Sequence, residues 1–93
     1  MEQLCQNLSP QYDQVLTHVL LFSPRRRRIA EIDVLGIKGE YCDAYEVKCS
    51  YRPTKARKQL RRIRKVLSPL RQVKNTFFYC GDTGIMENIL DNQ

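Results

Sequence analysis

The stretch EIDVLGIKGEYCDAYEVK, residues 31–48, decides the fold of this chain. Two runs rich in β-branched, aromatic and aliphatic residues lie on either side of a Lys-Gly-Glu-Tyr break, which is the pattern of a β-hairpin. A two-residue loop at Gly39 and Glu40 suits this break, because glycine supplies a positive φ at the first loop position without steric cost. The sequence therefore predicts two antiparallel strands, over residues 27–38 and 42–50.

Both predicted strands carry acidic residues within their apolar runs. With a two-residue loop, Asp33 lies directly opposite Glu46, with Cβ atoms about 4.5–5.5 Å apart. Glu31 lies opposite Lys48 in the same register, and Glu46 and Lys48 share a face because they are two positions apart. Like charges opposite each other destabilise a sheet, so a divalent cation or an ion pair with Lys48 is expected to compensate the carboxylates. The alternative is an ordinary solvated strand face, and a slip of one residue would separate the acids.

The rest of the chain predicts further elements on both sides of the hairpin. Residues 2–8 suit a short helix that ends before Pro10, and QVLTHVLLF, residues 14–22, suits a strand. Alternation predicts that one face of this strand carries Val15, Thr17, Val19 and Leu21.

A long helix is predicted to follow the hairpin. Pro53 fits the first helical turn, and apolar residues recur at helical spacing through TKARKQLRRIRKVL. These apolar positions are Ala56, Leu60, Ile63 and Leu67. NTFFYC, residues 75–80, suits another strand, and GIMENILDN, residues 84–92, suits a last short helix. The predicted order is α, β, β, β, α, β, followed by this helix.

Length and charge define the class of protein. The 93 residues form one predicted domain, residues 1–93, with a thin core. Sixteen Lys and Arg against ten Asp and Glu give a net charge of +6, which indicates a polyanionic partner, most simply nucleic acid. No apolar stretch approaches the ~20 residues that span a bilayer, and the N-terminus lacks the features of a signal peptide, so we expect no membrane and a cytoplasmic location.

The cysteines form no C-x-x-C pair, so neither a zinc knuckle nor a usual iron–sulfur motif is present. They are Cys5, Cys42, Cys49 and Cys80. We expect four scattered, buried thiols; disulfides or an irregular metal site are the alternatives.

EIDVLG followed by YEVKCS resembles the active-site motif of the PD-(D/E)XK nuclease superfamily, which includes restriction endonucleases and archaeal Holliday junction resolvases. The predicted α-β-β-β-α-β order over residues 1–80 is similar to the core of that superfamily. Its signature corresponds here to Asp33 and to Glu46-Val47-Lys48, with Ile32 in place of the common proline. The resemblance implies an α/β protein with a restriction-endonuclease-like core, in which helices flank a mixed central sheet.

The resemblance also implies an activity, that of a metal-dependent DNA endonuclease. Asp33, Glu46 and the backbone carbonyl of Val47 would hold Mg²⁺ or Mn²⁺. Lys48 would lie beside the attacking water and the reacting phosphate. Many members place a further glutamate on the first helix, where Glu2 is the acidic residue of this chain.

The substrate implied is DNA rather than a small molecule, and its shape rather than a long sequence is the expected basis of recognition. Lys55 and Gln59 resemble the basic residue and glutamine that the family's second core helix turns toward the active site, and Arg52 precedes that helix at a favourable phosphate position. Residues predicted to bind nucleic acid are Arg27, Arg28, Arg52, Lys55, Lys58, Gln59 and Arg62. For many of the basic residues, a plain solvated surface is the alternative.

A resolvase-like enzyme cuts two strands symmetrically, which favours a homodimer, with GIMENIL, residues 84–90, as a contact or as a cap on its own core. Two other functions stay open from the sequence. One is a non-catalytic nucleic-acid-binding module with the nuclease fold, and the other is a subunit that docks on an acidic protein.

Overall fold

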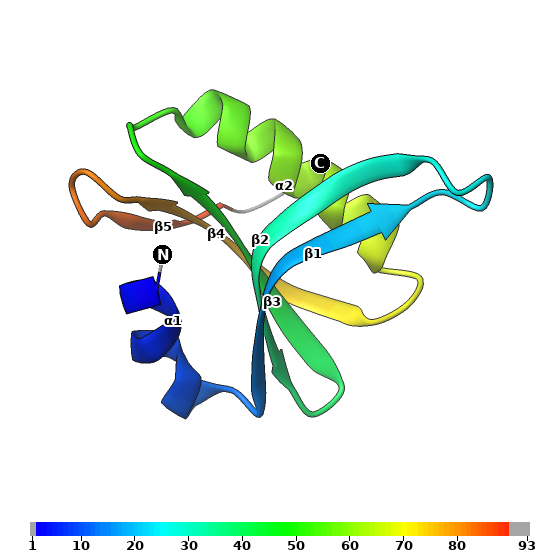
Figure 1. Ribbon diagram of the computed structural model, residues 1–93, viewed down its shortest axis with the longest axis horizontal. Coiled ribbons are helices and arrows are strands. Elements are labelled where there is room, and N and C mark those ends of the chain that lie inside the picture. The colour runs from blue at the N-terminus through cyan, green and yellow to red at the C-terminus, as the bar shows by residue number, and fades with distance from the viewer. Residues whose placement is uncertain (1, 90–93) are drawn as a thin grey trace.

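The computed structural model describes residues 2–89, which form a mixed α/β fold with a five-stranded sheet and two α-helices (Figure 1). In chain order the elements are α1 (Glu2–Leu8), the 3₁₀ turn η1 (Ser9–Gln11), β1 (Gln14–Phe22), β2 (Arg28–Lys38), β3 (Tyr41–Lys48), α2 (Pro53–Leu67), β4 (Gln72–Cys80) and β5 (Met86–Asn88). The strands lie side by side in the order β1-β2-β3-β4-β5. The predicted order α, β, β, β, α, β is confirmed.

The central hairpin has the predicted register. Lys38 pairs with Tyr41 across the loop, and the pairing continues to Val34 opposite Tyr45. Gly39 has a φ of +58°, which a side chain would strain, so the glycine sets the turn. β4 then pairs parallel to β3, and α2 forms the crossover between them. The sheet is therefore mixed, as predicted.

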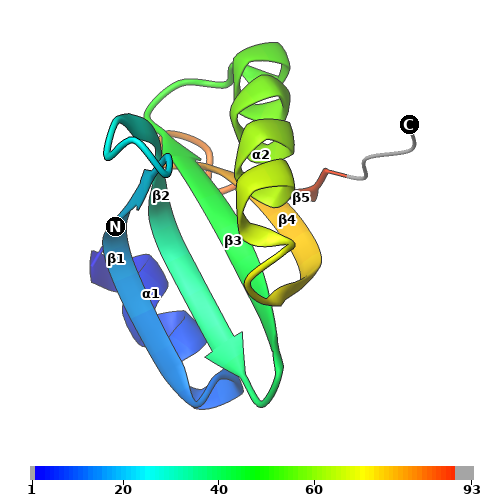
Figure 2. The same ribbon diagram turned by 90° about the vertical axis from the view of Figure 1, so that its right-hand side faces the viewer.

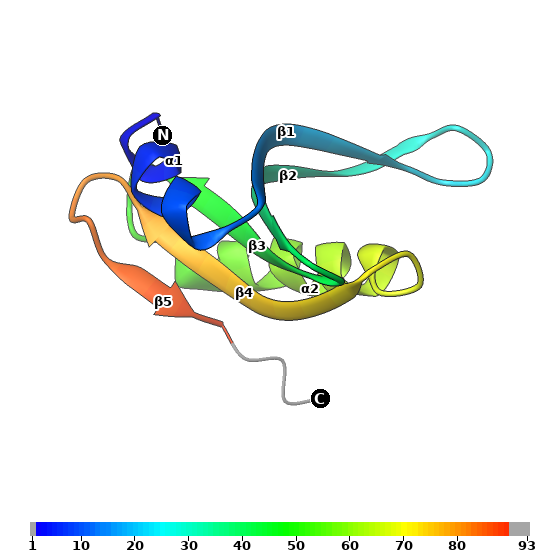
Figure 3. The same cartoon turned by 90° about the horizontal axis from the view of Figure 1, so that it is seen from below.

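The two helices cover opposite faces of the sheet (Figures 2 and 3). α2 begins with Pro53 in its first turn and buries all four predicted apolar positions. Its side of the sheet supplies a core that includes Leu35, Cys42, Ala44, Phe78 and Cys80. On the other face, α1 packs Leu4 and Leu8 against Val34 and Tyr45.

The last predicted helix is wrong, because the described part of that segment forms the short strand β5. β5 pairs antiparallel with β4, and Ile89 exchanges hydrogen bonds with Thr76 at 2.8 and 2.6 Å. These contacts with a distant strand outweigh the weak local helical pattern. Ile89 is only 6% exposed and packs into the α2-side core, so it is not available for the predicted dimer contact. Residues 90–92 of that prediction lie outside the described residues.

The prediction that β1 keeps one face along its whole length is also wrong. Val15 packs on the α1 side, whereas Val19 and Leu21 pack on the α2 side. His18, between them, has a φ of +53°, and this left-handed residue turns the strand over. The same change of face occurs in the neighbouring strand β2 at the equivalent position.

All four cysteines are free thiols. Cys42 and Cys80 are buried and Cys5 is partly buried, but Cys49 is exposed, so the expectation of four buried thiols is wrong for Cys49. Within residues 2–89, no helix is both long enough and apolar enough to cross a membrane.

Candidate active site

Asp33 lies where β2 separates from β3. Ile32 packs on the α2 side of the sheet and Val34 on the α1 side, so the strand changes face at Asp33. The separation leaves the N–H of Val47 without a backbone partner on β2, and the Asp33 Oδ2 accepts this N–H at 2.8 Å. A carboxylate thus replaces a missing ladder bond and is fixed at the gap between the two strands.

Glu46 lies beside Asp33 and is almost completely buried, at 3% exposure. The pKa of Glu46 is raised to about 7, first by burial and then by the neighbouring charge of Asp33, while the Lys48 ammonium opposes both. A carboxyl with this pKa is about half protonated at neutral pH, and its environment favours a cationic partner when it ionises.

Lys48 is the cation nearest to Glu46, with its Nζ 3.1 Å from the Glu46 Oε2. Its side chain is 28% exposed, so the ammonium lies between the buried acid and solvent. The predicted grouping of Asp33, Glu46 and Lys48 is therefore present in the structure.

Glu31 is not part of this cluster, so the expected pairing with Lys48 is wrong. Its carboxylate binds the His18 Nδ1 at 3.0 Å and the Arg28 Nη2 at 3.6 Å. The physical reason is the change of face next to it: β2 pairs with β1 at this level, and its pairing with β3 ends at Val34.

The remaining two predicted site residues are Val47, which the structure describes, and Glu2, which it describes only in part. Val47 directs its N–H toward Asp33, and the N–H and C=O of one strand residue point to the same neighbour, so its carbonyl faces the same gap. Glu2 begins α1, but its side chain lies outside the described residues.

These donors suit magnesium better than a metal that needs many protein ligands. No group of three or more His, Cys, Asp or Glu side chains arranged to hold a metal occurs in the described part of the chain. Mg²⁺ is usually held by one or two carboxylates together with waters and substrate phosphates. Two carboxylates and one carbonyl at an open strand junction are sufficient for that pattern.

A basic groove runs along α2. The part of the groove along the N-terminal half of α2 is lined by four of the predicted nucleic-acid-binding residues, Lys55, Lys58, Gln59 and Arg62. It continues between α2 and the start of β2, where Ile29, Lys58, Arg61, Arg62 and Lys65 line it. Arg61 and Lys65 belong to the basic surface of the helix, which the sequence also predicts to follow a phosphate backbone, whereas Ile29 was not expected here because only the fold brings the start of β2 against α2.

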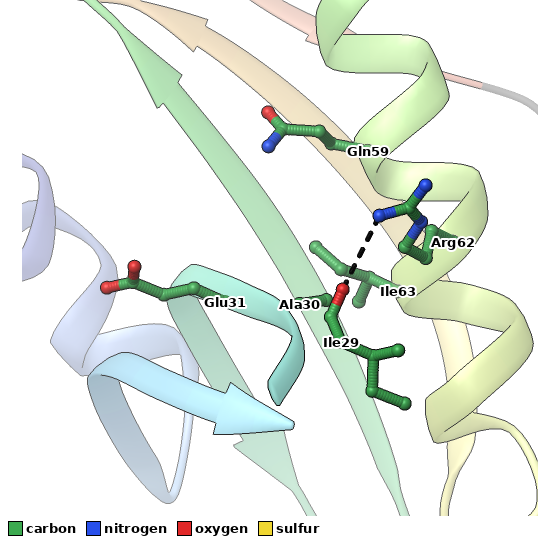
Figure 4. Close-up of a pocket in the computed structure, with 6 residues that line it drawn as sticks. All are labelled: Ile29, Ala30, Glu31, Gln59, Arg62 and Ile63. Atoms are coloured by element: carbon green, nitrogen blue, oxygen red, sulfur yellow. Dashed lines mark hydrogen bonds between the residues drawn. The ribbon is translucent and has the colours of Figure 1, made fainter. Parts of the chain in front are cut away.

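Figure 4 shows the small pocket at the middle of this groove. Gln59 and Arg62 extend from α2 toward the start of β2, and the Arg62 Nη1 lies 3.5 Å from the carbonyl oxygen of Ile29, while Glu31 points away. The pocket volume is about 40 Å³, far below the ~300–1,000 Å³ typical of small-molecule sites. The wider part of the groove, beside Lys65, measures about 510 Å³. The feature that suits the groove to an extended polyanion is therefore its row of cationic side chains and not its volume.

The sequence matches no protein-family model and no curated protein. The functional argument therefore depends on the residues and on their geometry.

The other predicted binding residues lie at opposite ends of α2. Arg52 is exposed and immediately precedes the helix. Arg27 and Arg28 are exposed at the far end, where β1 connects to β2, and Arg28 is paired with Glu31. The predicted cationic residues thus extend along the whole length of α2.

Proposed function

We propose that this protein is a metal-dependent DNA endonuclease with a restriction-endonuclease-like fold, related to the PD-(D/E)XK superfamily. The observation that carries the proposal is the meeting of Asp33, Glu46 and Lys48 at the point where β2 leaves β3. The basic groove along α2 supports DNA as the substrate, because cationic side chains in a row neutralise successive phosphates.

Asp33, Glu46 and the Val47 carbonyl are the groups of this chain that would hold Mg²⁺ or Mn²⁺. The bound ion would supply Lewis-acid chemistry, lowering the pKa of a water and stabilising charge on the phosphate oxygens. The hydrogen bond from the Val47 N–H fixes the Asp33 carboxylate, so one ligand is oriented before any ion arrives. Glu46 must lose its proton to bind, and its raised pKa makes binding pH-dependent near neutrality.

Lys48 contributes a positive charge at the boundary between the buried acids and solvent. From this position the ammonium would orient the attacking water or stabilise negative charge on the phosphate. Without a bound ion, the same ammonium offsets the charge of Glu46 when that group is ionised.

Symmetrical cutting of branched DNA would require a two-fold dimer. The exposed residues Ile85 and Met86, at 45% and 39% exposure, remain candidates for its contact, whereas Ile89 belongs to the protein's own core. Sedimentation at micromolar concentration distinguishes a dimer from a monomer, and Ile85→Ser should shift the equilibrium toward monomer if this segment forms the contact.

The experiment is cleavage of labelled single-stranded, duplex, flapped and four-way-junction DNA with Mg²⁺, Mn²⁺ or EDTA. Asp33→Asn and Lys48→Met are compared with the parent protein, since the asparagine oxygen still accepts the Val47 N–H and preserves the local fold. We expect metal-dependent cutting that both substitutions abolish while DNA binding persists. Absence of cutting on every substrate would overturn the proposal.

A non-catalytic DNA-binding module is the second candidate, and one observation favours it. The 3.1 Å ion pair between Lys48 and Glu46 compensates a buried acid without any metal ion. In that case Mg²⁺ would act on DNA binding only by competing for the phosphates, so its effect on affinity would be the same for Asp33→Asn and for the parent protein.

A further inference from the structure

The hairpin formed by β1 and β2 extends beyond the rest of the sheet (Figures 1 and 3). Its tip is SPRRRR, residues 23–28, which we name the arginine turn. The proposed chemistry at Asp33 does not require this projection. Its shape and its charge are therefore independent observations.

The arginine turn has a defined shape. The Ser23 N–H donates to the Arg27 carbonyl, and the Arg26 N–H donates to the Ser23 carbonyl, both at 2.8 Å. The Ser23 hydroxyl oxygen also accepts the N–H groups of Arg25 and Arg27, each at 3.2 Å. Arg26 has a φ of +65°, a left-handed conformation that is unfavourable for a non-glycine residue. Such strain persists where the surrounding bonds fix it, and it often accompanies a binding role.

The charges of the arginine turn are largely uncompensated. Among residues 2–89, the ion pairs of this region involve Arg28, which binds Glu31, and none is formed by Arg25, Arg26 or Arg27. All three side chains are exposed. Three neighbouring exposed guanidinium groups on a hydrogen-bonded turn are suited to a polyanion, since arginine binds phosphates in bidentate fashion.

The arginine turn adjoins the α2 groove. Lys55, Lys58, Arg62 and Lys65 recur at intervals of three and four residues and so form one stripe along α2. Ile29, at the start of β2 and one residue beyond the arginine turn, lines the groove together with Lys58, Arg62 and Lys65. At about 3.3 Å per strand residue, the tip lies roughly 20 Å along β2 from Asp33.

We propose that the arginine turn is a second phosphate-binding site, which holds the backbone of duplex DNA that continues from the α2 groove. With one phosphate per 3.4 Å along each strand, roughly 20 Å corresponds to about six base pairs. The substrate would therefore be duplex DNA that extends at least about six base pairs from the cut on the hairpin side. This inference depends on the proposed function for the position of the cut, but not for the binding itself.

The test is equilibrium binding to an 18-base-pair duplex and to a six-base-pair stem closed by a loop, in EDTA so that no cutting interferes. The variant is Arg25→Gln with Arg27→Gln, whose backbone bonds to Ser23 are kept. The matched control is Lys38→Gln with Lys74→Gln, which removes two charges near the opposite end of β2.

We expect the arginine variant to lower the salt slope of binding to the long duplex by about 1.8, from two fewer neutralised phosphates. Between 50 and 200 mM salt, this corresponds to a change of about tenfold in its affinity relative to the parent protein. The loss should be smaller on the short stem, which is barely long enough to reach the arginine turn from the proposed site. The control should keep the parent slope.

Equal slopes for the arginine variant and the parent protein would overturn the second site, even if the nuclease is confirmed. A reduced slope would support it, even if no substrate is cut, and the arginine turn would then belong to a binding module. Cleavage by Asp33→Asn tests the nuclease separately, so the two failures are distinguishable.

Discussion

Replacing Glu46 with glutamine should stabilise the metal-free protein at alkaline pH and leave its stability unchanged at acid pH. Glutamine is close in shape to a protonated glutamate and never ionises. The pKa of Glu46 rises from 4.5 to about 7 on folding. A group with a raised acid pKa holds its proton in the fold, so its contribution falls as pH rises from about 4.5 to about 7 and is constant above that.

The magnitude follows from the pKa values. One pKa unit corresponds to about 1.4 kcal/mol, so ionisation of Glu46 costs the fold roughly 3 kcal/mol at pH 8. Glu46 is 3% exposed, and solvent screening therefore reduces this figure little. At pH 5 the parent residue is protonated in the fold but largely ionised in the unfolded chain, so the two proteins should differ by only roughly 1 kcal/mol in free energy of unfolding.

The assay is urea denaturation followed by circular dichroism at pH 5 and pH 8, with EDTA throughout. Glu40→Gln, in the exposed turn between β2 and β3, is the control for loss of one carboxylate. The difference in free energy of unfolding between Glu46→Gln and the parent protein should grow by roughly 2.5 kcal/mol from pH 5 to pH 8. A difference independent of pH, or a variant destabilised at pH 8, would refute the reasoning about burial.

Three further predictions concern stability. Mg²⁺ at a hundred times its dissociation constant should raise the unfolding free energy by about 2.7 kcal/mol, measured as a melting-temperature increase that Asp33→Asn lacks; an equal increase in both proteins would contradict the metal site. Gly36→Ala should cost about 1–3 kcal/mol in urea denaturation, because its Cβ would lie 2.7 Å from the Tyr12 ring; unchanged stability would contradict this packing. Tyr12→Phe should lower the free energy of unfolding by about 1.5–3 kcal/mol in the same assay, because it removes the 2.6 Å hydrogen bond from the Tyr12 hydroxyl to buried Asp43. A neutral effect would show that the Asn75 N–H, which also donates to Asp43, stabilises this carboxylate by itself.

The parts of the fold that follow from local signals are predictable from the sequence. The loop at Gly39 sets the register of β2 and β3, and this register brings Asp33 next to Glu46. The spacing of apolar residues from Ala56 to Leu67 gives the buried face of α2. These signals lie within a few residues of the structure they determine.

The features that the sequence does not predict depend on distant contacts or on an unusual backbone. β5 forms because it can pair with the edge of β4, and the sequence of β5 itself contains no local signal for a strand. Alternation assumes a regular strand, so it fails at His18, whose positive φ turns β1 over. Because β2 changes face at Asp33, the carboxylate of Glu31 binds His18 and does not reach Lys48.

That irregularity also has a functional consequence under our proposal. A regular β2 would pair with β3 beyond Val34 and satisfy the Val47 N–H with a backbone carbonyl. The change of face instead opens the sheet and lets the Asp33 carboxylate take that N–H. The departure from regular structure therefore coincides with the residues that would perform the chemistry.

The most direct test of the nuclease proposal is a single-turnover comparison of Asp33→Asn with Glu31→Gln on the best-cleaved DNA in Mg²⁺. Both substitutions remove one carboxylate from β2, but only Asp33 reaches Glu46 and Val47. We predict that Asp33→Asn abolishes cutting and that Glu31→Gln retains the parent rate within a few-fold. Equal rates for the two variants would contradict an active site at the junction of β2 and β3.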